Sequence, residues 1–415
     1  MRKPNCLSIV ETKKLWEIAI EFLTRIDSAL IEYNLKFAYI MLKFAKLERL
    51  SFNKIKKFVF VSCFNDIGRL HLNQEKSSKS IETYLFLKYF SPLKDFSNVL
   101  LEKTLYDKSS KYRRDALRFK ICMDYTKNLV LYNDKDKALS YLIPENYVDV
   151  DFRKLSKLVK SSDLLHELHS MNYKDQVYQV MGYSIFKDRE KEELIEMLSS
   201  LFEMYSVQTL YHSKVTAYTA YYLARKMRVN KEQIKKLYIG ALCHDLGKVC
   251  IPLSILEKNG KLTPEEYEIM KTHVTHSKEI LQHELNFDII EIAYRHHERI
   301  DGTGYPNMVP GERMTLEQKI MQVSDVYSAL IAKRSYKDEF SITDTMNILF
   351  EEANNKKFDM SVVEMLNKYS KKVVKSTNKL MEEANNTYSK ISNERNKLIE
   401  FYEKRPELKS IDLYD

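Results

Sequence analysis

Residues 238–248 read Tyr-Ile-Gly-Ala-Leu-Cys-His-Asp-Leu-Gly-Lys, an apolar run that ends in a histidine and an aspartate. The run has the character of a buried helix, and Gly247 is placed to end it. Burying an imidazole and a carboxylate without partners is costly, and a bound metal ion offsets that cost. Neighbouring helical side chains project about 100° apart, so Asp245 can bridge two ions while His244 binds one of them. The stretch therefore predicts a helical protein with a buried metal centre.

Histidine is concentrated around this stretch, because seven of the ten histidines lie between residues 212 and 297. Such clustering favours metal ligation, since imidazole is the commonest ligand for transition metals at neutral pH. A lone histidine is usually a surface or satisfied core residue, and that interpretation is given to His71, His166, His169 and His283. The candidate ligands, besides His244 and Asp245, are His212, His273, His296, His297 and Asp325, the last in an otherwise apolar stretch.

The rest of the sequence predicts an all-α chain with more than one domain. A length of 415 residues exceeds one small core, and only 8 Gly and 8 Pro leave few turns for a large sheet. Apolar residues follow helical spacing through residues 15–47, 194–227, 232–246, 264–283 and 316–333. The segment 296–315 breaks this pattern with clustered Gly and Pro, so we expect an irregular loop that carries function.

Composition favours a cytoplasmic protein without a membrane span. The five cysteines are scattered without a CxxC spacing, which is typical of reduced thiols. No apolar run approaches the roughly 20 residues of a spanning helix, and no signal-peptide pattern is found. The net charge of +9 comes from lysines interleaved with acids, which indicates a solvated surface and no stable nucleic-acid binding.

A motif similar to residues 244–248 lies in the first half of the chain. Asn65-Asp66-Ile67-Gly68-Arg69 resembles residues 244–248 at an offset of 179, and the register holds without a gap over about thirty preceding residues. Chance similarity between amphipathic helices is the alternative; we favour duplication because the Asp-x-Gly-basic turn is shared. Tyr33 then stands for His212, Asn65 for His244, and Thr126 lies near the position of Asp325. These side chains are poor metal ligands, so the first copy is expected to be metal-free.

Four regions follow from these patterns. Residues 1–150 are predicted to form the degenerate helical domain, and residues 151–195 a helical linker. Residues 196–370 hold the metal-binding domain, and residues 371–415 form a charged helical tail. The degenerate half is expected to serve packing, regulation or a homodimer contact, and helical segments elsewhere are a second way to form that dimer.

Two motifs carry a resemblance to a known family. Residues 244–248, together with His-His-Glu-Arg-Ile-Asp-Gly-Thr-Gly-Tyr-Pro at 296–306, resemble the two signatures of the HD-GYP phosphohydrolases. The resemblance covers roughly residues 205–340, and the second motif is nearly complete. It implies an HD-type helical bundle that holds two or three iron or manganese ions. It also implies hydrolysis of cyclic di-GMP, or of cyclic GMP-AMP in some members.

By position, the resemblance implies roles for individual residues. Asp245 would bridge the ions, and Lys248 would contact the scissile phosphate or the nucleophile. The implied metal ligands are His212, His244, Asp245, His273, His296, His297 and Asp325. The implied substrate contacts are Gly304, Tyr305, Pro306, Arg334 and Lys337.

Three positions depart from the family pattern. Gln208 replaces a glutamate that helps some members to hold a third metal, so we expect two divalent ions, Fe or Mn. Val215 replaces an arginine and Ser328 an aspartate. Both positions are expected to contact the metal ligands and to modulate them without binding the metal.

The sequence therefore predicts a bacterial second-messenger enzyme of signal transduction. It would hydrolyse cyclic di-GMP to pGpG or GMP with metal-activated hydroxide. A broader nucleotide phosphohydrolase, and a catalytically weak scaffold that responds to a cyclic dinucleotide, remain as alternatives.

Overall fold

The protein is all-α in the computed structural model, which describes residues 9–70, 79–101, 108–144, 147–170, 172–182, 186–205, 211–332 and 342–405. Within these ranges there is no β-strand, as the sequence predicted. The chain divides into two compact units: residues 1–26 with 186–388, called unit 1, and residues 27–185 with 389–415, called unit 2. None of the helices within the described ranges is long and apolar enough to cross a membrane.

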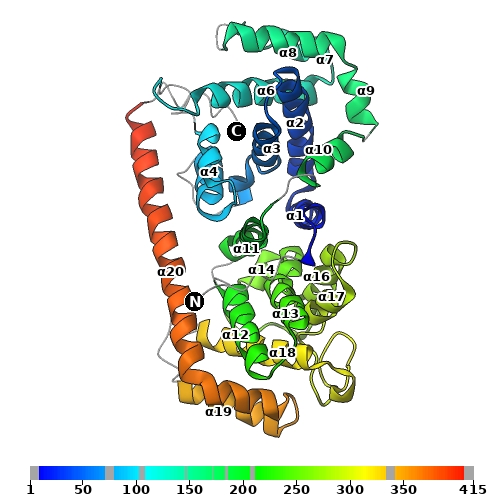
Figure 1. The fold of residues 1–415 in the computed structure, drawn as a ribbon, viewed down its shortest axis with the longest axis vertical. Coiled ribbons are helices and arrows are strands. Elements are labelled where there is room, and N and C mark those ends of the chain that lie inside the picture. Colours follow the sequence, from blue (N-terminus) through cyan, green and yellow to red (C-terminus); the bar gives the residue numbers. More distant parts are fainter. Residues whose placement is uncertain are drawn as a thin grey trace. The chain divides into compact units, whose positions relative to one another are not determined.

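Unit 1 holds the predicted metal ligands and is built mainly of short helices (Figure 1). Its elements are α1 (Thr12–Ile26), α11 (Asp188–Tyr205), α12 (His212–Lys226), α13 (Lys231–Cys243), η6 (Leu246–Cys250), α14 (Leu253–Leu256), α15 (Pro264–Lys271), α16 (His273–Leu281), α17 (Phe287–Tyr294), η7 (Gly311–Arg313), α18 (Leu316–Ala332), α19 (Ile342–Asn354) and the first part of α20 (Met360–Glu403). Unit 2 contains α2 (Ser28–Leu47), α3 (Phe52–Cys63), η2 (Ile67–Leu70), α4 (Lys79–Phe90), η3 (Lys94–Leu100), α6 (Arg113–Tyr132), α7 (Lys135–Ser140), α8 (Asp149–Ser161), α9 (Leu164–His169), α10 (Asn172–Gly182) and the end of α20.

Helix α13 forms the centre of unit 1, because its second half is buried on all sides from Leu237 to Cys243. It packs against α12, α17 and α18, which surround it with apolar side chains. A β-carbon at Gly240 would lie 2.8 Å from Ile292 Cγ2, so glycine permits the close approach of α17. This packing carries the end of α13, and with it His244, into the interior of the unit.

Three of the predicted helices are divided in the structure. The run expected over 15–47 is split at Asp27, whose carboxylate accepts a hydrogen bond from Leu30 N at 2.8 Å and caps α2. The run over 264–283 is divided at Thr272, which ends α15 and precedes α16. The run over 194–227 falls into α11 and α12. Apolar spacing alone did not reveal these breaks, because it continues across them.

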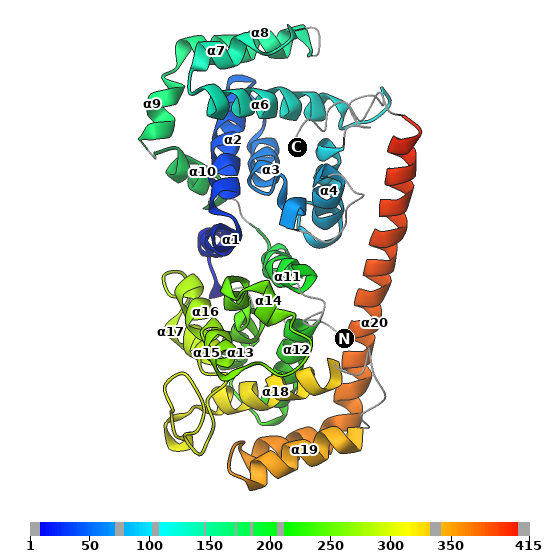
Figure 2. The ribbon, with the colours of Figure 1, turned by 180° about the vertical axis from the view of Figure 1, so that it is seen from behind.

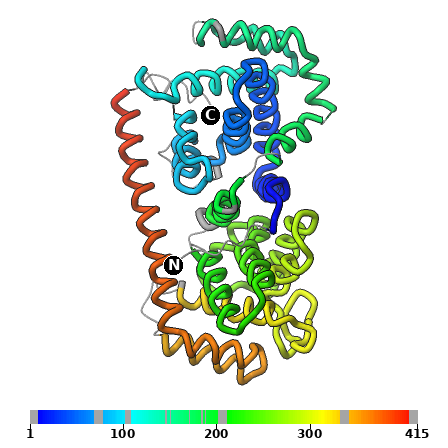
Figure 3. Tube along the Cα trace, in the orientation of Figure 1, coloured from blue at the N-terminus to red at the C-terminus, as the bar shows by residue number. Residues whose placement is uncertain are grey.

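The compact units cross the predicted domain boundaries. Helix α1 belongs to unit 1, where Lys191 Nζ donates to Val10 O at 2.7 Å and Arg25 pairs with Glu279 at 3.2 Å. The boundary predicted at residue 370 falls inside α20, which is one uninterrupted helix from Met360 to Glu403 (Figure 3). The beginning of α20 belongs to unit 1 and its end to unit 2, so the charged tail is not a separate domain. Long-range packing, which local composition does not show, decides both points.

The two units contain the same helix–helix turn at an offset of 179 residues. Arg49 and Arg228 both have positive φ, at 53° and 61°. In unit 2 the next amide, Leu50 N, donates to Ala45 O at 3.1 Å; the equivalent bond in unit 1 joins Val229 N to Ala224 O at 3.0 Å. Each turn leads into a helix followed by a 3₁₀ segment, α3 and η2 or α13 and η6.

Candidate metal centre

The predicted ligands lie on three helices of unit 1 or in the segments that follow two others, and they meet in the interior of the unit. His212 is the first residue of α12, and His273 is the first residue of α16. His244 follows α13, and Asp245 begins the turn into η6. The other three are His296 and His297, just after α17, and Asp325, in the middle of α18. All seven predicted ligands are thus brought together, although they are spread over more than one hundred residues of sequence.

One group of three candidate ligands consists of His212, His244 and Asp245. Their ligand atoms lie within 4.8 Å of one another, and all three residues are buried. The Nε2 atoms of the two histidines are 3.2 Å apart, and Asp245 Oδ2 lies 3.5 Å from His212 Nε2 and 3.2 Å from His244 Nε2. One cation could be shared by these three atoms.

A second group consists of His273, His296 and His297. His273 Nε2 and His296 Nε2 are 3.3 Å apart, and the rings of His296 and His297 are 4.0 Å apart between centroids. His297 is the most exposed of the seven candidate ligands, with 21% of its side chain accessible. The centre is therefore open to solvent on the side of His297.

Two carboxylates connect these groups. Asp245 directs Oδ2 to the first group and Oδ1 to the second, where it lies 3.5 Å from His273 Nε2 and 3.8 Å from His296 Nε2. Asp325 Oδ1 lies 2.9 Å from His212 Nε2, while its Oδ2 lies 3.9 Å from His297 Nδ1. Each carboxylate thus has one oxygen toward each group, an arrangement that allows it to bridge two cations.

Hydrogen bonds on the far side of the rings fix the orientation of the histidines. In His244, His273 and His296, Nδ1 lies 2.6–2.8 Å from the backbone carbonyl three residues earlier. A carbonyl accepts only from a protonated nitrogen, so Nδ1 carries a proton in all three rings and Nε2 is the nitrogen that faces the centre.

His212 is oriented differently, through the hydroxyl of Ser328. Ser328 Oγ lies 2.8 Å from His212 Nδ1 and donates its own proton to Asp325 O at 2.8 Å. Thr216 Oγ1 lies 2.5 Å from the same hydroxyl. Ser328, which sequence reasoning noted only as a departure, therefore links two of the candidate ligands.

Electrostatics keep the imidazoles and carboxylates in different charge states. Burial lowers the pKa of His273 to about 4 and that of His296 to about 3, so both are neutral at pH 7. Burial also opposes charge on His244, but Asp245 and Asp325 outweigh it and raise its pKa to about 10. Burial raises the pKa of Asp245, yet His244 and Lys248 hold it well below its usual range. The ionised carboxylates of Asp245 and Asp325 favour positive charge in the centre, and a metal ion would supply such a charge.

The turn after Asp245 is packed tightly against α16. A β-carbon on Gly247 would lie 2.1 Å from His273 O and 2.3 Å from Ser277 N, so only glycine fits. Gly247 N donates to Ser277 Oγ at 2.8 Å, and Ser277 Oγ donates to His244 O at 2.6 Å. Lys248 Nζ then lies 2.5 Å from Asp245 Oδ2. The motif thus fixes the positions of two ligands and a cation with one short turn.

The loop after His297 folds back toward the centre. Tyr305 N donates to His297 O at 3.2 Å, and the two rings lie 4.8 Å apart. The loop is held by Glu298, a fully buried carboxylate that accepts hydrogen bonds from Asn307 N at 2.7 Å and Val309 N at 2.9 Å. The sequence analysis assigned no role to Glu298. The position of this carboxylate, directly before the Gly- and Pro-rich loop, was the signal that could have indicated a contact with the loop backbone. Gly304 and Pro306 belong to the same loop, whereas Arg334, Lys337 and Gln208 lie outside the described residues.

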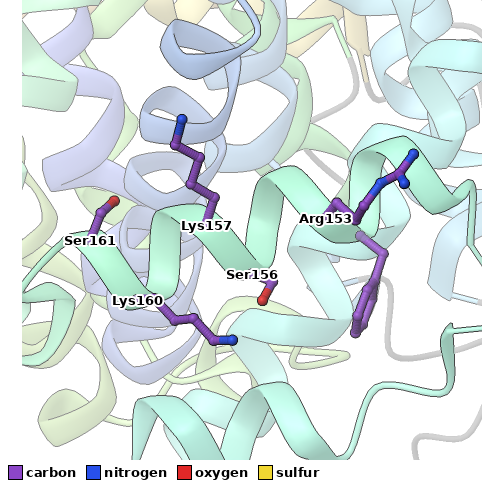
Figure 4. Close-up of a pocket in the computed structure, with 6 residues that line it drawn as sticks. Arg153, Ser156, Lys157, Lys160 and Ser161 are labelled. Atoms are coloured by element: carbon purple, nitrogen blue, oxygen red, sulfur yellow. The ribbon is translucent and has the colours of Figure 1, made fainter.

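A shallow pocket in unit 2 is not related to this centre. Its lining residues all come from α8 and are Phe152, Arg153, Ser156, Lys157, Lys160 and Ser161. Lys157 and Lys160 extend from opposite sides of the helix (Figure 4), so they do not converge on one ligand.

Comparison with known proteins places the centre in a family. Residues 194–362 match the HD domain family. Over 239 residues the chain is 29% identical to 3'3'-cGAMP-specific phosphodiesterase 1 of Vibrio cholerae, covering 53% of this chain and 56% of that protein. It is 34% identical over 183 residues to the cyclic di-GMP phosphodiesterase response regulator RpfG of Xanthomonas campestris, covering 43% and 48%. A cyclic di-GMP phosphodiesterase of Thermotoga maritima is 33% identical over 185 residues, covering 44% and 50%.

This part of the chain is therefore an HD domain, a helical fold whose members depend on metal ions. The relatives that match this part are named as cyclic di-GMP or cyclic GMP-AMP phosphodiesterases, in agreement with the resemblance of the two motifs to the HD-GYP signatures. The chain spans about half the length of these relatives.

Proposed function

We propose that unit 1 is a metal-dependent phosphodiesterase that hydrolyses a cyclic dinucleotide. The carboxylate of Asp245, with one oxygen toward each group of histidines, is the observation that carries this proposal. The names of the relatives support the substrate class. Cyclic di-GMP, with pGpG or GMP as product, is the substrate we put first.

The residues of the centre fit two divalent ions. Among the residues that the structure describes, none donates a hydrogen bond to the buried Asp245 Oδ1, as expected of an atom that binds a cation. The first ion would be held by His212, His244 and Asp245, and the second by His273, His296 and His297, with Asp325 near both. Imidazole and carboxylate without thiolate suit iron or manganese.

Bound ions would supply Lewis acidity that activates water and offsets the charge on the phosphate. The protein's own residues provide the remaining requirements. Lys248 places an ammonium group beside Asp245, where it can stabilise negative charge that develops on the phosphoryl oxygens. Asp245 and Asp325 hold ionised carboxylates between the histidines, and the Tyr305 ring lies against His297 of the second group.

Anaerobically purified protein loaded with Mn²⁺ or Fe²⁺ provides the test. It should bind about two ions per chain and convert cyclic di-GMP to a linear product, while His244→Ala should do neither. Absence of turnover of cyclic di-GMP, cyclic GMP-AMP and linear dinucleotides by the fully loaded protein would contradict the proposal. Turnover of linear nucleotides alone would favour the broader phosphohydrolase, and a phenotype that survives His244→Ala would favour the scaffold.

We further propose that unit 2 derives from a duplicated HD domain that has lost its ligands. The shared turn at Arg49 and Arg228 supports this, as does the packing of the two motif glycines. Gly68 N donates to Thr83 Oγ1 at 2.9 Å, as Gly247 N does to Ser277 Oγ. The homodimer and the cytoplasmic location stay predictions from the sequence.

A further inference from the structure

Helix α15 lies beside the open side of the metal centre, yet it contains no buried residue. Figure 2 shows it next to α16, the helix that begins with His273. Its start is fixed by a capping box between Thr263 and Glu266, and Glu266 also pairs with Lys258 at 2.8 Å. The helix is thus held by hydrogen bonds at its beginning, while its own side chains remain available for a ligand.

Two aromatic rings and one ammonium group form a corner on this side. The rings of Tyr267, on α15, and Tyr305 have centroids 6.4 Å apart and an interplanar angle of 82°. Lys271 Nζ lies over both rings, 5.4 Å from the centroid of Tyr267 and 5.8 Å from that of Tyr305. Tyr305 in turn lies against His297, the most exposed candidate ligand. The corner therefore adjoins the side from which a phosphate would enter.

The corner is accessible to a ligand. Tyr267 is 48% exposed, so much of its ring is open to a ligand. Lys271 pairs with Glu268 at 2.6 Å, but Glu268 is a surface residue with 69% of its side chain accessible. An exposed ion pair of this kind contributes little and is readily exchanged.

We propose that Tyr267 and Lys271, together with Tyr305, bind a purine base of the substrate and favour guanine. This inference rests on the proposed function, and it specifies which base of the cyclic dinucleotide the site recognises. A base stacks on an aromatic face whatever its identity. The ammonium of Lys271 only donates hydrogen bonds, so it matches guanine, which has acceptors at O6 and N7, better than adenine, which has a donor at N6.

Four variants test the two contributions separately. Tyr267→Leu should lower kcat/KM for cyclic di-GMP and cyclic di-AMP alike by about 10-fold, whereas Tyr267→Phe keeps the ring and should retain the activity. Lys271→Met should lower kcat/KM for cyclic di-GMP about 10-fold more than for cyclic di-AMP. Lys137→Met is the matched control, since Lys137 Nζ also lies over a tyrosine ring, 4.7 Å from Tyr132, in unit 2.

Metal content and turnover of bis(p-nitrophenyl) phosphate should be unchanged in Lys271→Met, because neither needs a guanine contact. Equal losses with every substrate, or loss of metal, would mean that Lys271 only supports His273, and the inference would be overturned. Unchanged kinetics in Tyr267→Leu would overturn it as well. If the wild-type chain hydrolyses no diester, the proposed function fails, and calorimetric binding of cyclic di-GMP to the same variants still decides whether the corner binds a base.

Discussion

Ser328 Oγ lies 2.8 Å from Nδ1 of His212, the ring nitrogen that faces away from the metal centre. His244, the other histidine of the first group, uses a backbone carbonyl of its own helix. A hydroxyl on α18 therefore determines how the first residue of α12 faces the centre.

Removal of that hydroxyl should weaken metal binding. Ser328→Ala leaves His212 Nδ1 without its acceptor, and loss of such a partner typically reduces metal affinity or activity by about 10- to 100-fold. Titration of the chelated protein with Mn²⁺ measures the affinity. Ser199→Ala is the control, because Ser199 Oγ is also buried but donates to Leu242 O. Equal affinities in Ser328→Ala and the wild type would rule out an orienting role.

Asp245→Asn should remove the carboxylate that the two groups of histidines share, so the protein should no longer hold two ions together. The amide has nearly the same shape, but it lacks the negative charge that both histidine groups and Lys248 face. We expect loss of at least one ion per chain and a fall in activity of more than about 100-fold, since a direct ligand matters more than its supporting partner. Metal analysis and kinetics measure both effects. Asp288→Asn, which changes a surface acid paired with Lys236, should behave as the wild type does.

Gly247→Ala should separate η6 from α16. Its β-carbon would meet His273 O at 2.1 Å, and relief of such overpacking costs about 1–3 kcal/mol or more. Because His273 moves with this backbone, metal content should fall together with the melting temperature. Gly68→Ala is the matched variant in unit 2, where the β-carbon would lie 2.6 Å from Lys79 O. It should lower stability and leave metal content intact; loss of metal in both variants would contradict this account.

The stability of unit 1 should depend on pH through Glu284. Burial and a hydrogen bond to Glu17 raise the pKa of Glu284 to about 7, and Lys14 and Lys13 counteract this only in part. Because the folded state binds this proton more tightly than the unfolded state, its stabilisation is complete below about pH 4.5 and lost as pH rises through about 7. Thermal melts at pH 5 and pH 8 should differ less for Glu284→Gln than for the wild type. A wild-type difference that the substitution leaves unchanged would assign the effect to other groups.

Local sequence was sufficient to select the candidate ligands that the structure brings together. His244 and Asp245 stood out because they end an apolar run, where unpaired polar groups are costly. The breakers between residues 296 and 315 marked the loop, because Gly and Pro act within a few residues of themselves. The helical class followed from spacing and composition, which are also local properties.

Other features depend on partners distant in the sequence. The acceptor for His212 is 116 residues away, so spacing could not assign a role to Ser328. The exposure of Tyr267, the loop contacts of Glu298 and the assignment of α1 to unit 1 depend equally on which elements pack together.

The sequence by itself determined the residue types of the metal centre and the helices that carry them, because burial cost and helical periodicity act over a few neighbouring residues. Only the tertiary structure decided which oxygen of Asp245 faces which histidines, since that depends on the packing of α12, α13, α16 and α18. Tertiary packing also decided that α15 has no buried residue, because the exposure of a helix depends on which other elements pack against it.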